Sequence, residues 1–280
     1  MTFIRPPAVA GKFYPADPTR LSALVGDLLQ RAIQDAATRP QAGPARLRAI
    51  IAPHAGYAYS GPIAASAYAH VAAGPAARAA IRRVVLLGPA HRAPLRGLGA
   101  SSAGAFATPL GDVPLDRAAL QRLLPLPFVG WHDEAHEPEH GLEVHLPFLQ
   151  LLLADFRLLP LVVGPCAPED VAAVLEPFAE DAHTLLVVSS DLSHFHDYEE
   201  AQHLDRHTAR RIEGLHALAA ADACGRYAIN GLLHLARQRG WQARTVDLRS
   251  SGDTRGPRDR VVGYGAFIFE GFPLESHLME

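Results

Sequence analysis

Cysteine and lysine are the residue types that this chain uses most sparingly. Its 280 residues include two cysteines, Cys166 and Cys224, and one lysine, Lys12. Two isolated cysteines form neither a disulfide framework nor a Cys-x-x-Cys zinc ribbon. A single lysine near the start leaves none for a phosphate-binding P-loop or for a Schiff base deeper in the chain.

Strong charge and several standard motifs are also missing. The formal net charge is -3, which gives no electrostatic basis for binding nucleic acid or an anionic membrane. No Gly-x-Ser-x-Gly elbow marks a serine hydrolase, and no Gly-x-Gly-x-x-Gly turn marks a dinucleotide fold. The opening residues MTFIRPPAVAG lack the apolar core of a signal peptide, and no apolar run reaches membrane-spanning length. We expect a cytoplasmic protein without nucleic-acid or membrane partners.

Three short apolar runs are each followed closely by a histidine. They are residues 48–52, followed by His54; residues 84–87, followed by His91; and residues 185–188, followed by Asp191 and His194. Runs of this length and composition are typical of buried parallel strands. Because ligands of open α/β sheets bind beyond the carboxyl ends of the strands, the pattern predicts a site at that edge.

The rest of the chain alternates helical and extended patterns. Helices are expected from residue 18 and over 62–71, 115–124, 168–179, 199–220 and 227–239, with further strands over 158–163, 242–248 and 261–269. The Gly/Pro/Ser-rich segment from His91 to Asp112 is expected to be a lid or binding loop. With no repeat or break in composition, residues 1–280 are expected to form one α/β domain, a mainly parallel sheet with helices on both faces.

The residues expected at the sheet edge are of the kinds that bind metals. Imidazole is the commonest transition-metal ligand near neutral pH, and two histidines with one anionic ligand leave open positions on iron for substrate and dioxygen. The anionic candidates are Asp191, the carboxylates Glu139 and Glu143 of a histidine-rich segment, and Cys224. The sequence alone leaves these alternatives open.

Position along the chain adds detail on Cys224 and suggests further residues that face the cleft. Cys224 comes just before a predicted helix, where the helix dipole and free N–H groups favour thiolate over thiol. His140, Glu143 and Ser190 are candidates to face the cleft and contact a substrate.

Five motifs in order resemble the Memo family. They are IIAPHAGYAYSG, LLGPAHR, EHGLEVHLPF, VVSSDLSH and ACGRYAI. In prokaryotes this family is known as the B protein of the AmmeMemoRadiSam system. The resemblance extends from AGKFYP to VVGYGAF. It implies the fold of the class III extradiol (LigB-like) dioxygenases, which use non-haem iron.

The resemblance also implies roles for particular residues. His54, His91 and Cys224 match the metal ligands of the family, for which iron or copper is implied. For this chain we expect iron(II) first, copper second and zinc third. His194 matches an acid/base histidine, and Asp191 precedes it in the same motif. The system's AMMECR-like and radical SAM proteins are implied as partners. Gly141 stands where the family usually has serine.

Four functions therefore compete. The leading one is a metal-dependent redox protein of unknown substrate. The second is an extradiol dioxygenase in which Asp191 or Glu143 completes the ligand set. The third is a binding module without turnover, in which basic residues such as Arg92 and Arg226 hold an anionic small molecule or peptide. The fourth is zinc-dependent hydrolysis, since three ligands and one vacant position also suit a catalytic zinc.

Overall fold

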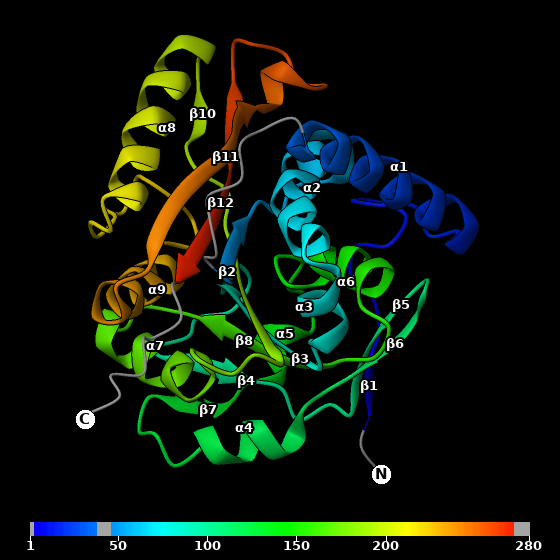
Figure 1. Ribbon diagram of the computed structural model, residues 1–280, viewed down its shortest axis with the longest axis vertical. Coiled ribbons are helices and arrows are strands. Elements are labelled where there is room, and N and C mark those ends of the chain that lie inside the picture. Colours follow the sequence, from blue (N-terminus) through cyan, green and yellow to red (C-terminus); the bar gives the residue numbers. More distant parts are fainter. Residues whose placement is uncertain (1–2, 38–45, 272–280) are drawn as a thin grey trace, which may run out of the picture.

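The computed structural model describes residues 3–37 and 46–271, and its centre is a mixed β-sheet (Figure 1). Nine strands of this described part form the sheet in the order β10-β12-β2-β9-β3-β8-β4-β7, with β11 also paired to β12. Their bounds are β2 (Arg46–Ala52), β3 (Arg83–Pro89), β4 (Leu98–Ala100), β7 (Val129–Trp131), β8 (Arg157–Val163), β9 (Thr184–Ser189), β10 (His194–His196), β11 (Gln242–Ser250) and β12 (Val261–Gly271). A second sheet joins β1 (Ile4–Arg5), β5 (Ala105–Thr108) and β6 (Gly111–Pro114).

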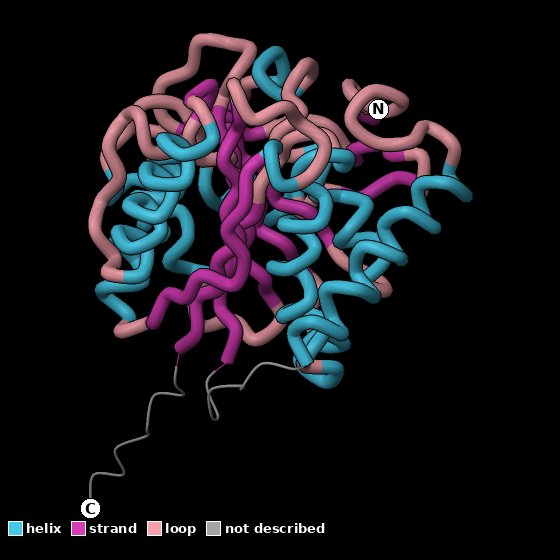
Figure 2. Tube along the Cα trace, turned by 90° about the horizontal axis from the view of Figure 1, so that it is seen from above, coloured by secondary structure: helices cyan, strands magenta, loops and turns pink. Residues whose placement is uncertain are grey.

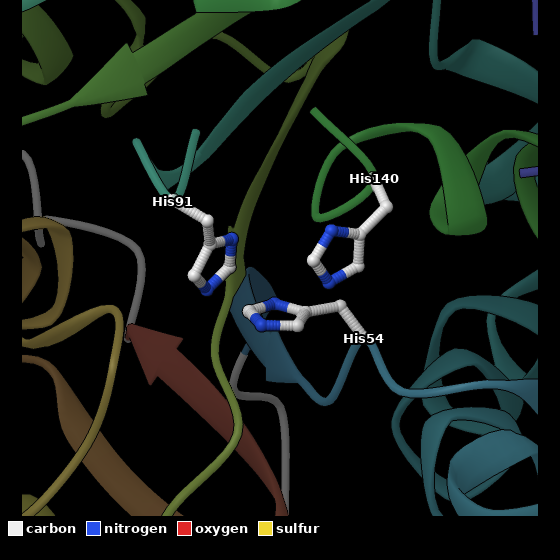
Figure 3. A group of neighbouring side chains, drawn as sticks. All are labelled: His54, His91 and His140. Atoms are coloured by element: carbon white, nitrogen blue, oxygen red, sulfur yellow. The ribbon is translucent and has the colours of Figure 1, made fainter. Parts of the chain in front are cut away.

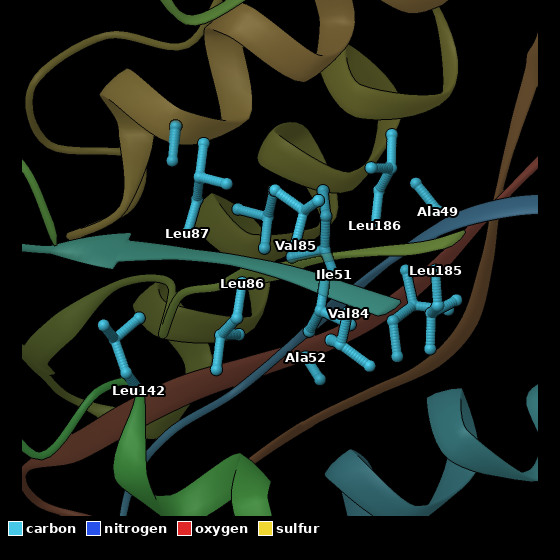
Figure 4. Packing of buried hydrophobic residues seen from close by; sticks show 14 of the residues in the cluster. Ala49, Ile51, Ala52, Val84, Val85, Leu86, Leu87, Leu142, Leu185 and Leu186 are labelled. Carbon is cyan, nitrogen blue, oxygen red and sulfur yellow. The ribbon is translucent and has the colours of Figure 1, made fainter. Parts of the chain in front are cut away.

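The four central strands, β2, β9, β3 and β8, run parallel, as the sequence predicts. The sheet becomes antiparallel on either side of them, where β12 pairs with β2 and β4 pairs with β8. The central strands are apolar and almost entirely inaccessible to solvent (Figure 4). Burial of each aliphatic side chain contributes roughly 1.5–3 kcal/mol, so the strands that end at the site form the most firmly held part of the fold.

Helices cover both faces of the main sheet (Figures 1 and 2). On one side α2 (Tyr57–Ala73) packs on β2 and β12, with α1 (Pro18–Ala37) outside it. On the other side α9 (Arg226–Arg239) packs on β3 and β9, and α8 (Tyr198–Glu213) packs on β11 and β12. The remaining helices are α3 (Pro75–Ala80), α4 (Arg117–Leu123), α5 (Asp133–His136), α6 (Leu146–Leu152) and α7 (Pro168–Leu175), with short 3-10 turns η1 (Glu143–His145), η2 (Glu176–Phe178) and η3 (Ser251–Asp253). Within the described ranges, no helix is both long enough and apolar enough to cross a bilayer.

Three sequence-based boundaries differ from the structure. Helix α2 begins at Tyr57 rather than at residue 62, because Pro62 is accommodated inside the helix. The segment from His91 to Asp112 is not an open loop, since it contains β4, β5 and the start of β6. These strands consist largely of glycine and alanine, which give little strand signal in a sequence. Helix α8 ends at Glu213, where Gly214 follows.

Two buried histidines away from the sheet edge predict a loss of stability in acid. His136 is 2% exposed, with Nε2 2.9 Å from the Gly99 carbonyl, and His145 is fully buried beside Tyr68. Burial lowers the pKa of His136 to about 4 and that of His145 to about 3. Between pH 6.5 and these values the unfolded chain binds protons that the folded chain does not, so stability present above pH 6.5 is lost as the pH falls.

We expect His136 alone to account for about 3 kcal/mol of this loss, at about 1.4 kcal/mol per pKa unit between 6.5 and about 4. Urea denaturation at pH 7.5 and pH 4.5 measures it. The matched variant is His136→Gln, whose amide keeps a donor for Gly99 but does not titrate. A pH dependence identical in His136→Gln and the unmodified protein would contradict the assignment. Burial raises the pKa of Asp205 to about 6, so this carboxyl group makes the protein more stable as the pH falls. Its effect is the same in His136→Gln and in the unmodified protein, and it cancels in the comparison.

Candidate metal centre

Three imidazoles meet beyond the carboxyl ends of the central strands (Figure 3). His54 follows β2, His91 follows β3, and His140 lies in the segment between α5 and η1. Their ring centroids are separated by 5.0 Å (His54 to His91), 5.4 Å (His54 to His140) and 4.8 Å (His91 to His140). One ligand atom from each side chain lies within 4.8 Å of the others. The prediction that histidines at the strand ends lie close together is therefore confirmed for His54 and His91.

A hydrogen-bond chain fixes which nitrogen of His54 is free. Its Nδ1 lies 2.6 Å from the Ser189 hydroxyl, and that hydroxyl donates to the Gly141 carbonyl. The Ser189 oxygen therefore accepts from Nδ1–H, which leaves the Nε2 lone pair for a ligand. Burial, followed by the neighbouring histidines, lowers the pKa of His54 well below 6.5. The ring is neutral at physiological pH, the state that binds metals.

Glu139 orients the second imidazole and approaches the third. Its carboxylate is 1% exposed, accepts from the backbone N–H of His91 at 2.8 Å, and lies 2.8 Å from His91 Nδ1. The Nδ1 of His140 is 3.4 Å from the same Oε1 atom. Burial tends to raise the pKa of Glu139, but the hydrogen bonds that it accepts from His91 and from the Gly141 backbone N–H outweigh burial, so the net shift is downward. An ionised carboxylate on Nδ1 leaves Nε2 of His91 free, the usual arrangement around a metal-bound histidine.

The environment of Gly141 shows what a serine would meet there. A Cβ added at Gly141 would lie 3.1 Å from Glu139 Oε1 and 3.4 Å from His54 Nδ1. A side chain at this position would therefore press on Glu139, which orients His91, and would touch the His54 ring. The hydroxyl beside His54 is that of Ser189.

Cys224 lies beside His54 but is not the activated thiolate that its position suggested. Its Sγ is 3.3 Å from His54 Nε2 and accepts a hydrogen bond from the Asp191 backbone N–H. Burial, reinforced by the Asp191 carboxyl group, raises the pKa of the thiol to about 12. The thiolate prediction was thus wrong for the metal-free chain, because burial outweighs a helix N-terminus worth about 1 kcal/mol or less. The protonated thiol can donate to His54 Nε2.

Asp191 and His194 lie on the loop after β9. Asp191 Oδ1 accepts from the His54 backbone N–H at 2.8 Å, and Oδ2 is 4.0 Å from His54 Nε2. Burial raises the pKa of this carboxyl group to about 7. His194 Nδ1 lies 2.8 Å from the Leu192 carbonyl, so Nδ1 donates and Nε2 is free. Partial burial lowers the pKa of His194. The Asp191 carboxyl group can therefore exchange a proton near neutral pH, whereas the His194 ring is neutral at pH 7.

The remaining candidates are occupied by contacts within the protein. Ser190 is fully buried, donates to the Asp191 carbonyl and accepts from the Gly225 backbone N–H. Glu143 was expected to contact substrate, but its buried carboxylate accepts hydrogen bonds from the N-terminal residues instead. The Arg226 guanidinium lies 4.2 Å from the Tyr227 ring centroid and donates to the Tyr227 hydroxyl.

Comparison with known proteins gives a consistent assignment. The family model "Memo-like protein" matches residues 5–268. MEMO1 family proteins of Ignicoccus hospitalis and Aeropyrum pernix are 34% and 37% identical, over 95% and 94% of this chain and 98% of each relative. A solved structure of an uncharacterized protein from Escherichia coli K12 shares 15% identity with a TM-score of 0.49, covering 81% of this chain and all of that one. By the family match and these relatives, the chain belongs to the Memo family.

Proposed function

We propose that this protein is a metal-dependent redox protein that holds iron(II) or copper between His54, His91 and Cys224, with His140 as a fourth donor within reach. The observation that supports this most is the pair of hydrogen bonds that His54 and His91 donate from Nδ1, to Ser189 and to Glu139, because they leave Nε2 free on both rings. The distance of 3.3 Å from His54 Nε2 to Cys224 Sγ also fits. A nitrogen about 2.0 Å and a sulfur about 2.3 Å from the same ion would lie about as far apart as these two atoms do.

The chemistry of the donors narrows the choice of metal. Imidazole suits iron, copper and zinc, while a thiolate adds a soft donor that favours copper(I) and tolerates iron(II). When bound, iron or copper would supply electron transfer to or from a substrate or dioxygen, which zinc would not. Zinc with a vacant position would instead support hydrolysis, and the identity of the bound metal separates the two functions.

Side chains of the protein would then transfer protons to and from a substrate. His194, neutral and with Nε2 free, would accept a proton from a substrate or return one to it. Asp191 holds the backbone of His54 in place through its 2.8 Å hydrogen bond. It thereby positions a ligand.

The protonation state of Cys224 gives a test of its role. Because burial holds the thiol protonated, binding as thiolate must release one proton. We expect the affinity for cobalt(II) to rise about tenfold per pH unit between pH 7.5 and 9, above the pKa of Asp191. Anaerobic titration with cobalt(II) against a competing chelator measures this slope.

The variant Cys224→Ser should lose the slope, while the control Cys166→Ser should keep it. The control is matched because burial also raises the pKa of Cys166, to about 11. Parallel pH profiles in all three proteins would remove Cys224 from the ligand set. His140 or Asp191 would then be the third ligand, and Asp191 would favour the carboxylate site of an extradiol dioxygenase.

A further inference from the structure

We infer that the N-terminal arm, residues 3–16, is an integral part of the metal centre, in which the Arg5–Glu143 ion pair positions Glu139 and His140. This inference rests on the proposed function, because it concerns how the same site is held ready for a metal. The arm itself supplies no ligand. It acts through the segment between α5 and η1, which contains both Glu139 and His140.

Arg5 ties the two ends of that segment together. Its side chain is 3% exposed and donates to the carbonyl of His136 at 2.7 Å, to the carbonyl of Glu139 at 2.5 Å and to Glu143 Oε2 at 2.7 Å. His136 and Glu143 flank the segment, and Glu139 lies in its middle. One rigid guanidinium therefore fixes the path of the backbone from which Glu139 reaches His91.

Glu143 in turn fixes the arm. Its carboxylate, 0% exposed, accepts from the backbone N–H groups of Ala8 and Val9 at 2.7 and 3.0 Å, and from the Tyr14 hydroxyl at 2.6 Å. Together with Arg5 these donors occupy both of its oxygens. The Arg5–Glu143 ion pair thus holds the arm and the segment between α5 and η1 together in the protein interior.

The arm also touches the site directly. The Phe13 ring meets the His140 ring edge-on, with centroids 4.9 Å apart. The Phe13 carbonyl accepts from the backbone N–H of Tyr57, the first residue of α2 after His54. Phe13 therefore limits the movement of one imidazole while its backbone anchors the arm next to another.

This support is separable from the framework of the sheet. The strands that precede His54 and His91 pair with β9, β8 and β12, whereas β1 of the arm pairs only with β5 in the described part of the chain. Weakening the arm should therefore disturb Glu139 and His140 more than the central strands. Groups that orient metal ligands typically affect metal affinity about 10- to 100-fold when altered.

The experiment compares Arg5→Lys and Glu143→Gln with the unmodified protein. Arg5→Lys keeps the positive charge, and Glu143→Gln keeps the size of the side chain and one acceptor oxygen. Each is a smaller change than truncating one partner of a buried pair, which costs about 3–5 kcal/mol. Anaerobic cobalt(II) titration gives the affinity, and the rise in Tm on adding cobalt(II) gives a second readout. We expect affinity to fall about 10- to 100-fold in both variants, with a smaller metal-induced rise in Tm.

Arg83→Lys is the control, because Arg83 forms an ion pair with Asp116 at the opposite end of β3 from His91. It should lower the Tm of the metal-free protein without changing cobalt(II) affinity. If the arm variants do not fold, Phe13→Leu and Tyr14→Phe provide the same test by removing the ring contact and one hydrogen bond. Unchanged affinity in the folded arm variants would overturn the inference. If the unmodified protein does not bind cobalt(II), the proposed function itself fails.

Discussion

Replacing His54 by alanine is expected to abolish metal binding, with affinity falling at least about 100-fold, while the fold is kept. His54 has Cys224 Sγ 3.3 Å from its free nitrogen and lies beside both other imidazoles. Its loss removes the imidazole that lies between the Cys224 thiol and the imidazoles of His91 and His140. The preceding strand β2 is held by backbone pairing to β9 and β12, which does not involve this side chain.

Metal content by mass spectrometry, together with circular dichroism, checks this prediction. His91→Ala should behave in the same way, because Glu139 orients His91 for the same ion. The control is His207→Ala, which removes an exposed histidine on α8. A folded His54→Ala protein that retains a full equivalent of metal would show that the three imidazoles do not form the site.

Replacing His194 by alanine is expected to leave the metal in place and to reduce reactivity by about 10²–10⁴-fold, the usual contribution of a general acid/base. The metal should stay because, among the described residues, the imidazoles whose ligand atoms lie within 4.8 Å of one another are those of His54, His91 and His140, and not that of His194. The Nδ1 of His194 is engaged by the Leu192 carbonyl and Nε2 is free, and partial burial lowers the pKa so that the ring is neutral at pH 7. A neutral imidazole beside a metal can accept a proton that an imidazolium cannot.

The rate at which dioxygen oxidises the reduced, metal-loaded protein measures this reactivity without a known substrate. His196→Ala is the matched control, since His196 lies two residues further along β10 and its Nδ1 is 3.0 Å from a carboxylate oxygen of Glu200. The rate of oxidation of His196→Ala by dioxygen should equal that of the unmodified protein. Loss of metal from His194→Ala to the extent expected for His54→Ala would make His194 a ligand instead.

Much of this arrangement follows from local sequence. The apolar runs before His54, His91 and Asp191 predicted buried parallel strands that end at one edge of the sheet, and β2, β9 and β3 do pair in parallel in that order. The runs were informative because parallel strands buried on both faces require continuous β-branched and aliphatic residues. The glycine- and alanine-rich strands β4 and β5 gave no such signal, so that region was wrongly expected to be a loop.

The chemistry of the site was harder to predict than its place. Cys224 was expected to be a thiolate because helix position can be read from a sequence, whereas the burial that raises its pKa cannot. Glu139 was only one of several candidate ligands until its contact with His91 was seen. The pairing of Arg5 with Glu143 joins residues 138 positions apart, and no local pattern indicates such a contact.

X-ray absorption at the metal edge tests the central claim most directly, on protein purified without oxygen and loaded with one equivalent of iron(II) or copper. We predict imidazole nitrogen scatterers at about 2.0–2.1 Å and one sulfur at about 2.3 Å, with the sulfur lost in Cys224→Ser. A coordination shell of oxygen scatterers without imidazole, or failure of the folded protein to take up a stoichiometric metal, would contradict a metal centre built on His54 and His91.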